Sequence, residues 1–167
     1  MVHWRSLANL ALQLAVLLLL VAAMLFVRMP LVSGASMSPD ITSGEYVLIN
    51  TFAYRFSSPA RGDIVAFRTD RDARGPFIKR VVGLPGDRIT IERGVVSVDG
   101  IALHEPYVRY PDTRSFPPAV VPPGDVYVLG DNRADSEDSR FFGPVPAAQL
   151  IGRAVAGIWP PADIGRL

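Results

Sequence analysis

Lys79 is the residue whose surroundings most clearly indicate chemistry, and it is the only lysine among 17 basic residues. It lies in the apolar run Phe77–Val82, where strand alternation places its side chain on the face of Phe77 and Val81, opposite Arg80. If that face is buried, the lysine pKa falls below its usual value of about 10.4, because burial disfavours the ammonium. A neutral lysine can accept the proton of a serine hydroxyl, as in Ser–Lys nucleophilic catalysis. The alternative is a lysine whose ammonium reaches solvent and keeps an ordinary pKa.

Two further segments carry polar groups that could act with this lysine. The segment 33–40 contains Ser36 and Ser38, either of which could also be a simple turn residue. The segment 130–140 is rich in acids, which raises the question of a calcium site: Asp131, Asp135, Glu137 and Asp138. The glycine and final glutamate of an EF-hand loop are missing, and Arg133 and Arg140 lie nearby. We therefore expect ion pairs or turn hydrogen bonds in this segment, with no metal and no organic cofactor.

Composition excludes several other classes of protein. The chain has no cysteine, which rules out disulfides, thiolate nucleophiles and cysteine-ligated zinc or iron–sulfur sites. Its net charge of +1 does not indicate a nucleic-acid partner. Since His3 stands beside the start of the chain, any histidine-dependent site would depend on His104, which lies in a proline-rich stretch and is expected at the surface.

The N-terminal part of the sequence predicts membrane attachment. Residues Leu7–Val27 are almost entirely apolar and, as a helix, would rise about 30 Å, enough to cross the hydrocarbon core. A cleaved signal peptide is the alternative, since Ala22 and Ala23 are small, but the run exceeds the usual apolar length of such peptides. We interpret residues 7–27 as a retained transmembrane anchor, with residues 1–6 in the cytoplasm and 28–167 outside it.

The remaining sequence predicts a mostly β, antiparallel sheet or barrel-like domain. Residues 89–100 indicate consecutive hairpins. Residues 104–123 hold many prolines and are interpreted as an extended excursion from the sheet. Residues 147–150 fit one short helical turn. The expected strands are short apolar runs separated by glycine-containing turns: 46–49, 63–67, 77–82, 88–91, 95–98, 126–129 and 152–159.

Four segments together resemble the bacterial type I signal peptidases, and they occur in the order of that family behind one apolar segment. Ser36-Met-Ser-Pro39 resembles the S-M-x-P box, and the run 61–67 is similar to the R-G-D-I-V-x-F strand. Residues 78–87 resemble the lysine box, and residues 130–140 match G-D-N-x-x-x-S-x-D-S-R. Each motif is short, but four in the family order are specific to it.

The resemblance implies a role for each matching residue. Ser36 would be the nucleophile, Lys79 the general base that later activates water, and Ser136 the residue that orients the amine. The backbone N–H of Ser36 would be one oxyanion donor. Gly34 stands where well-studied Gram-negative members carry a serine hydroxyl, so the second donor is left open. The matching residues expected to shape the site are Met37, Pro39, Arg80, Asp131, Asp138 and Arg140.

The function implied is that of a membrane-anchored serine endopeptidase that removes signal peptides from exported preproteins. It would act outside the bacterial cytoplasmic membrane, with lipid as a further partner, on cleavage sites with small residues at −1 and −3. We expect the pocket walls in residues 36–40, 46–49 and 64–67.

Three other functions fit parts of the same pattern. A relative that matures one substrate, such as a conjugative pilin, fits the modest length of the chain and the short excursion at residues 104–123. A self-cleaving repressor protease also uses serine and lysine, but would need a soluble DNA-binding domain where this chain has its apolar segment. An inactive β domain that binds translocated chains would not need Ser36, Lys79 and Ser136 together.

Overall fold

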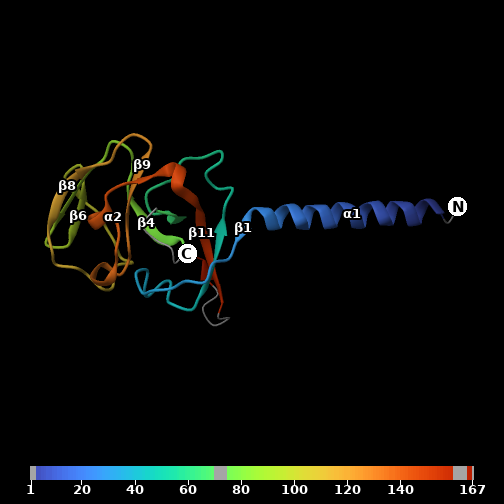
Figure 1. Ribbon diagram of the computed structural model, residues 1–167, viewed down its shortest axis with the longest axis horizontal. Coiled ribbons are helices and arrows are strands. Elements are labelled where there is room, and N and C mark those ends of the chain that lie inside the picture. The colour runs from blue at the N-terminus through green and yellow to red at the C-terminus, as the bar shows by residue number, and fades with distance from the viewer. Residues whose placement is uncertain (1–2, 70–74, 160–164, 167) are drawn as a thin grey trace.

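The computed structural model describes residues 3–69, 75–159 and 165–166 of the chain. It consists of one long helix, α1 (His3–Leu25), that projects from a body made mainly of β-strands (Figure 1). In the body, short helical turns are confined to the segments between strands: η1 (Arg133–Asp135), α2 (Ser139–Phe142) and η2 (Ala147–Gln149). The turn at η2 is the one predicted for residues 147–150.

Helix α1 exposes apolar side chains along its length, because it makes little contact with the body. Leu7 is 67% exposed, Leu19 71% and Met24 76%. Over the residues that are described, no helix combines the length and the hydropathy needed to cross a membrane. The expected transmembrane helix is therefore not confirmed. The helix ends at Leu25, and Val27–Arg28 instead form the short strand β1, which pairs with β2.

The larger sheet is antiparallel and carries the lysine strand near its middle. Its strands follow the order β1-β2-β11-β3-β4-β9-β10, with β12 paired to β11. Strand β3 is flanked by β11 and β4, and β4 by β3 and β9. The strands after β1 are β2 (Tyr46–Asn50), β3 (Ile64–Phe67), β4 (Phe77–Gly83), β9 (Asp125–Leu129), β10 (Val145–Pro146), β11 (Leu150–Trp159) and β12 (Gly165–Arg166).

The smaller sheet is also antiparallel and has the order β7-β6-β5-β8. It lies at the end of the body farthest from α1 (Figure 1). Its strands are β5 (Arg88–Glu92), β6 (Val95–Val98), β7 (Ile101–Ala102) and β8 (Phe116–Val120). The mostly β, antiparallel architecture is thus confirmed, while barrel-like closure is not seen among the described strands.

The seven predicted strands are all present, with ends shifted by one or two residues, and the predicted hairpins form β5, β6 and β7. The prediction for residues 104–123 is wrong at its C-terminal end, where Phe116–Val120 form β8. This strand contains Pro117 and Pro118, but it pairs only with β5 at the edge of the sheet. A proline is tolerated in an edge strand because its missing N–H leaves no partner carbonyl unbonded.

Strand β3 is buried on both faces, which explains its unbroken apolar sequence. Ile64 and Ala66 pack into one core cluster, whereas Val65 and Phe67 pack into another on the opposite face. The next strand, β4, follows the same division: Ile78 belongs to the first cluster and Val81 to the second. This arrangement positions Lys79, which lies between these two residues, inside the body.

Replacing Phe67 by alanine is expected to lower the free energy of unfolding by about 3–5 kcal/mol. The ring is fully buried and stacks on Phe77 with 5.6 Å between ring centroids. Thermal or urea unfolding of the full chain in detergent would measure the loss. Phe56→Ala is the matched control, since Phe56 is 84% exposed. Equal loss in both variants would contradict this assignment of the core.

Candidate active site

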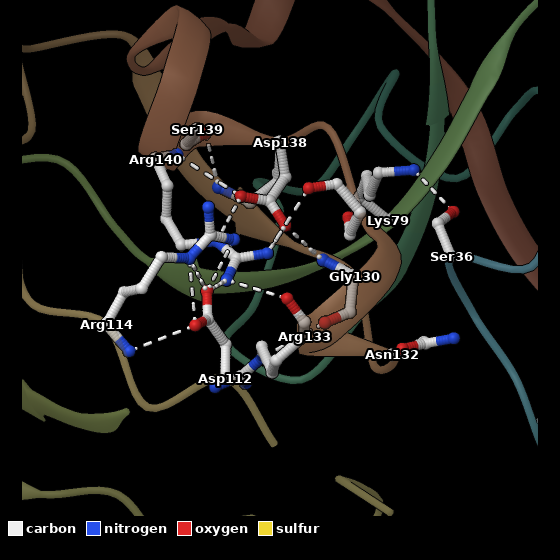
Figure 2. Close-up of polar contacts among 12 residues, drawn as sticks. Ser36, Lys79, Asp112, Arg114, Gly130, Asn132, Arg133, Asp138, Ser139 and Arg140 are labelled. Atoms are coloured by element: carbon white, nitrogen blue, oxygen red, sulfur yellow. Dashed lines mark hydrogen bonds and ion pairs between the residues drawn. The ribbon is translucent and has the colours of Figure 1, made fainter. Parts of the chain in front are cut away.

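The amine of Lys79 lies 2.7 Å from the hydroxyl oxygen of Ser36 (Figure 2). The two residues come from different parts of the fold. Lys79 is in the middle of β4, and Ser36 is in the turn between β1 and β2. The turn is held against the core because Met37, the next residue, is 2% exposed and packs with Ile41 and Ile78. The sequence-based pairing of Ser36 with Lys79 is therefore present in the structure.

Lys79 is buried, and burial lowers its pKa. The residue is 3% exposed, its Nζ donates to the carbonyl of Ile78 at 3.1 Å, and it lies 5.4 Å from the ring centroid of Phe77. Desolvation lowers the pKa of the amine from 10.5 to about 8, although the carboxylates of Asp138 and Glu137 act in the opposite direction. The alternative of a solvent-exposed ammonium is wrong. A usable fraction of the amine is neutral near neutral pH.

A cleft of about 460 Å³ opens directly onto the two reactive groups. One wall is formed by residues 30–37 and the other by residues 75–79, with Asp135 and Glu137 at its margin. Residues 46–49 and 64–67, which were expected to form its walls, do not line this cleft. Ile49 and Ala66 pack in the core and line a neighbouring hollow that also includes Pro30 and Pro76. Of the expected wall residues, Ser36 and Met37 line the cleft.

Two acids of the 130–140 segment are hydrogen-bonded to arginine side chains. Asp131 accepts two hydrogen bonds from Arg80, at 2.9 and 2.6 Å, and Asp138 accepts two from Arg140, both at 2.8 Å. These two carboxylates are ion-paired, as predicted. Burial raises the pKa of Asp131 above its usual value, and the Arg80 guanidinium opposes that rise. Among the described residues, no cluster of acids and histidines has the arrangement of a metal site.

Asp138 and Gly130 connect these ion pairs to the segment 33–40, which contains Ser36 and is called the nucleophile turn below. The Oδ2 of Asp138, which accepts from Arg140, also accepts the backbone N–H of Gly130 at 3.0 Å (Figure 2). Gly130 is closely packed: a Cβ at this position would lie 2.3 Å from the hydroxyl oxygen of Ser136 and 2.5 Å from the carbonyl oxygen of Ser36. Only a glycine lets the segment approach the nucleophile turn so closely.

Ser136 lies beside this glycine but does not have the contact that was expected. Its hydroxyl oxygen is buried and has no hydrogen-bond partner within the described chain. The amine of Lys79 instead bonds Ser36 and the carbonyl of Ile78. In this state, therefore, the predicted hydrogen bond between Ser136 and the amine is not formed.

The other motif residues near the nucleophile have simpler surroundings. Pro39 is exposed and follows a cis peptide bond. Gly34 lines the cleft with a positive φ of 107°, a conformation that favours glycine, and its N–H donates to the hydroxyl of Ser43 at 3.4 Å. It offers no side-chain donor for an oxyanion. His104 is exposed, as expected, and does not line the cleft.

Sequence reasoning missed several residues that surround the site. Asn132 stands inside a recognised motif without an assigned role, although it bonds the nucleophile turn. Glu105 and Tyr107 belong to the proline-rich excursion and contact the 130–140 segment and Arg80, respectively. The available signal was the presence of acidic and aromatic residues in a stretch that is otherwise rich in proline.

The sequence is similar to those of known proteins over most of its length. The sequence matches the family described as signal peptidase, peptidase S26, over residues 4–159. A protein of Synechocystis sp. named probable signal peptidase I-2 is 38% identical over 141 residues, which cover 81% of this chain and 65% of that protein, just under two thirds. Signal peptidase I of Bacillus caldolyticus is 35% identical over 143 residues, covering 77% of this chain and 78% of the relative.

A solved structure is similar in fold as well as in sequence. The crystal structure of a signal peptidase I from Enterococcus faecalis aligns with a TM-score of 0.52 and 32% sequence identity. The alignment covers 58% of this chain and 97% of the other. The β body described above therefore has the architecture of that structure.

The buried environment of Lys79 makes a direct prediction about its titration. Because this is the only lysine, a chain labelled with ¹³C at the lysine side chain gives one ε-carbon resonance. That resonance is expected to titrate near pH 8, well below 10.5. If the neutral amine is the base, as the sequence predicts, kcat/KM for peptide cleavage should rise as the pH increases through the same value. Titration near 10.5 would contradict the burial argument.

Proposed function

Because the chain belongs to the signal peptidase, peptidase S26, family, we propose that it is a type I signal peptidase, a serine endopeptidase that cleaves signal peptides from exported preproteins. The observation that carries the proposal is the 2.7 Å contact between a buried lysine amine and a serine hydroxyl at the floor of an open cleft. Serine attack assisted by lysine needs no metal or organic cofactor.

In the proposed reaction, Lys79 handles each proton. Its neutral amine takes the hydroxyl proton of Ser36 as Oγ attacks the scissile carbonyl carbon. The resulting ammonium returns this proton to the leaving amine when the peptide bond breaks, which leaves an acyl-enzyme and a neutral lysine. The amine then deprotonates a water molecule that attacks the ester, and the proton passes back to Ser36 as the signal peptide is released.

The negative charge on the carbonyl oxygen needs donors in the cleft. The backbone N–H of Ser36 is proposed as one of them, in the usual relation of an oxyanion donor to its own nucleophile. Gly34 has no hydroxyl, and its N–H is directed to Ser43, so the second donor is a different group from the serine of well-studied Gram-negative members. Ser136 is proposed to orient the amine when substrate displaces the present hydrogen bonds, since its buried hydroxyl is unpaired.

The substrate is proposed to bind as an extended strand along β4. Strand β9 pairs with β4 from Arg80 onward, so residues 77–79 have no strand partner on that side among the described residues. This leaves a free edge at the cleft wall for main-chain hydrogen bonds from a peptide. Val32, Met37 and Ile78 also line the cleft, and their apolar surfaces suit small residues at −1 and −3 of the cleavage site.

The apolar segment Leu7–Val27 is proposed to anchor the enzyme in the bacterial cytoplasmic membrane, with residues 1–6 in the cytoplasm and 28–167 outside. Its support is the run of exposed leucine side chains on α1, which would be unfavourable in water and favourable in lipid. Anchoring would hold the cleft near the bilayer, where signal-peptide cleavage sites emerge. The charge pattern gives no indication of a nucleic-acid partner.

Two alternative functions differ from this one in substrate range or in activity. A relative dedicated to a single substrate such as a conjugative pilin would use the same residues and would be distinguished by its range of preproteins. An inactive binding domain is not favoured by the contact between Ser36 and Lys79, which a binding role does not require.

Removing either member of the dyad is expected to abolish preprotein cleavage. Ser36→Ala removes the nucleophile and Lys79→Met removes the base, so kcat should fall by roughly 10⁴-fold or more. Ser38→Ala is the matched control, because it removes a hydroxyl from the same turn and should leave cleavage nearly unchanged. Gel analysis of several purified preproteins would measure this. Full activity in either variant would contradict the assignment of Ser36 as nucleophile and Lys79 as base. Cleavage of only one preprotein by the wild type would favour an enzyme dedicated to a single substrate.

Placing charge in α1 is expected to release the chain from lipid. Leu14→Arg combined with Leu17→Arg puts two guanidiniums into the apolar segment, each costing about 2.5–3.5 kcal/mol at the centre of a membrane helix. Flotation with phospholipid vesicles should recover the wild type and lose much of the double variant. Ile101→Arg is the control, since Ile101 is exposed on the smaller sheet. Equal flotation of all three proteins would argue against the anchor.

A further inference from the structure

Residues 104–115 are the part of the proline-rich stretch that precedes β8, and they are called the excursion from here on. They are bound to the segment 130–140, which lies against the nucleophile turn. Two carboxylates of the excursion pair with buried arginines: Glu105 with Arg133 and Asp112 with Arg140. The backbone makes a further connection, since the N–H of Ala134 donates to the carbonyl of Tyr110 at 3.2 Å. The excursion is therefore part of the support of the site.

The pair of Glu105 and Arg133 is nearly enclosed, and neither residue is one of the fixed letters of the recognised motifs. The two side chains are 10% and 4% exposed, and both oxygens of Glu105 accept from the guanidinium, at 2.6 and 3.0 Å. Tyr107 also donates its hydroxyl to Glu105 at 2.9 Å. A buried pair with two parallel hydrogen bonds fixes the orientation of the guanidinium plane.

This orientation is passed on to the main chain. The Nε–H of Arg133 donates to the carbonyl of Gly130 at 3.0 Å (Figure 2). Asn132, two residues after Gly130, donates two hydrogen bonds to the nucleophile turn. Its backbone N–H donates to the carbonyl of Ser36 at 3.0 Å, and its side-chain amide donates to the carbonyl of Ala35 at 3.1 Å. The peptide units on either side of the reactive serine are therefore both bonded to this residue.

The Asn132 side chain is itself fixed. Its carbonyl oxygen accepts the N–H of Asp135 at 3.1 Å, which leaves the amide nitrogen directed at the nucleophile turn. The residue is 8% exposed, so few alternative partners from solvent are available. Glu105, Arg133, Gly130 and Asn132 thus form a continuous series of contacts from the excursion to Ser36.

We propose that Glu105 and Asn132 are positioning residues for the nucleophile, with Arg133 as the connection between them. This inference rests on the proposed function and gives the excursion a part in it. Glu105 fixes Arg133, Arg133 fixes the carbonyl of Gly130, and the segment then presents Asn132 to the carbonyls of Ala35 and Ser36. With these two carbonyls held, the hydroxyl of Ser36 keeps its 2.7 Å separation from the lysine amine.

Glu105→Gln tests the proposal, because it keeps the size of the side chain and removes its charge. We expect kcat per active site, counted by acylation titration of the full-length enzyme, to fall about 10- to 100-fold, as for other small misplacements of reacting groups. KM should change less than about threefold, because Glu105 does not line the cleft. Arg109→Gln is the control: it removes an exposed charge from the same excursion, at a residue outside the contacts described above, and should leave kcat unchanged.

A double variant separates this role from a loss of stability. Asn132→Ala alone should also lower kcat, and its combination with Glu105→Gln should be little worse than the more damaging single change, because both act through one set of contacts. Independent, multiplicative losses would overturn the proposal. So would a Glu105→Gln enzyme that unfolds at a lower temperature but keeps the wild-type kcat per active site.

Hydrogen exchange of the Asn132 amide gives a readout that does not depend on activity. This amide is bonded to the carbonyl of Ser36, and its exchange is expected to be at least tenfold faster in Glu105→Gln than in Arg109→Gln. Equal exchange in the two variants would contradict the positioning role. Failure of the wild-type enzyme to cleave any preprotein would instead contradict the proposed function, and the exchange measurement would still decide the positioning role.

Discussion

The structure depends on the burial of one lysine. Lys79 lies in β4, with β3 on one side and β9 covering part of the other, so its ammonium has lost nearly all contact with water. An isolated charge in such a position is unfavourable, and the amine responds with a pKa lowered to about 8. The same two strands that bury the stem leave its end facing the cleft and Ser36. Burial therefore lowers the pKa of the amine and also directs it at Ser36.

Arginine and lysine have separate tasks around this site. Three arginines form buried or partly buried pairs with carboxylates: Arg80, Arg133 and Arg140. These pairs connect Asp40 and residues 105–112 to the segment 130–140. A guanidinium keeps its charge in proteins, which suits it to permanent ion pairs and excludes it as a base. Of these four buried or partly buried cations, Lys79 is the one without a hydrogen bond to a carboxylate. Its bonds go to a hydroxyl and a carbonyl, which leave it free to lose a proton.

Much of the fold could be predicted from local pattern. The alternation of apolar residues located the seven main strands, and the placement of Lys79 beside Phe77 and Val81 followed from the same rule. Strand β8 was missed because its prolines argue against a strand unless its position at a sheet edge is known. The cleft walls were misplaced for a similar reason: residues 64–67 are apolar because both of their faces are buried, which local sequence does not distinguish from a pocket wall.

The support of the nucleophile turn was beyond sequence reasoning, since its contacts join residues far apart in the chain. The amide of Asn132 and the carbonyl of Ala35 are 97 positions apart, and Glu105 meets Arg133 across 28. Ser136 illustrates the same limit. Its place in a motif predicted a hydrogen bond to the Lys79 amine, but in this state its hydroxyl is packed beside Gly130 and has no hydrogen-bond partner within the described chain.

The sequence by itself determined which groups are available for reaction. It contains one lysine, no cysteine, and four motifs, two of them with serines, whose order is that of the signal peptidases. Tertiary structure decided how these groups behave. The lowered pKa of Lys79, the 2.7 Å contact with Ser36 and the support from the excursion all arise from desolvation and from contacts between distant segments. Residue types and their order specify the chemistry, but a pKa and a distance exist only after the chain has excluded water.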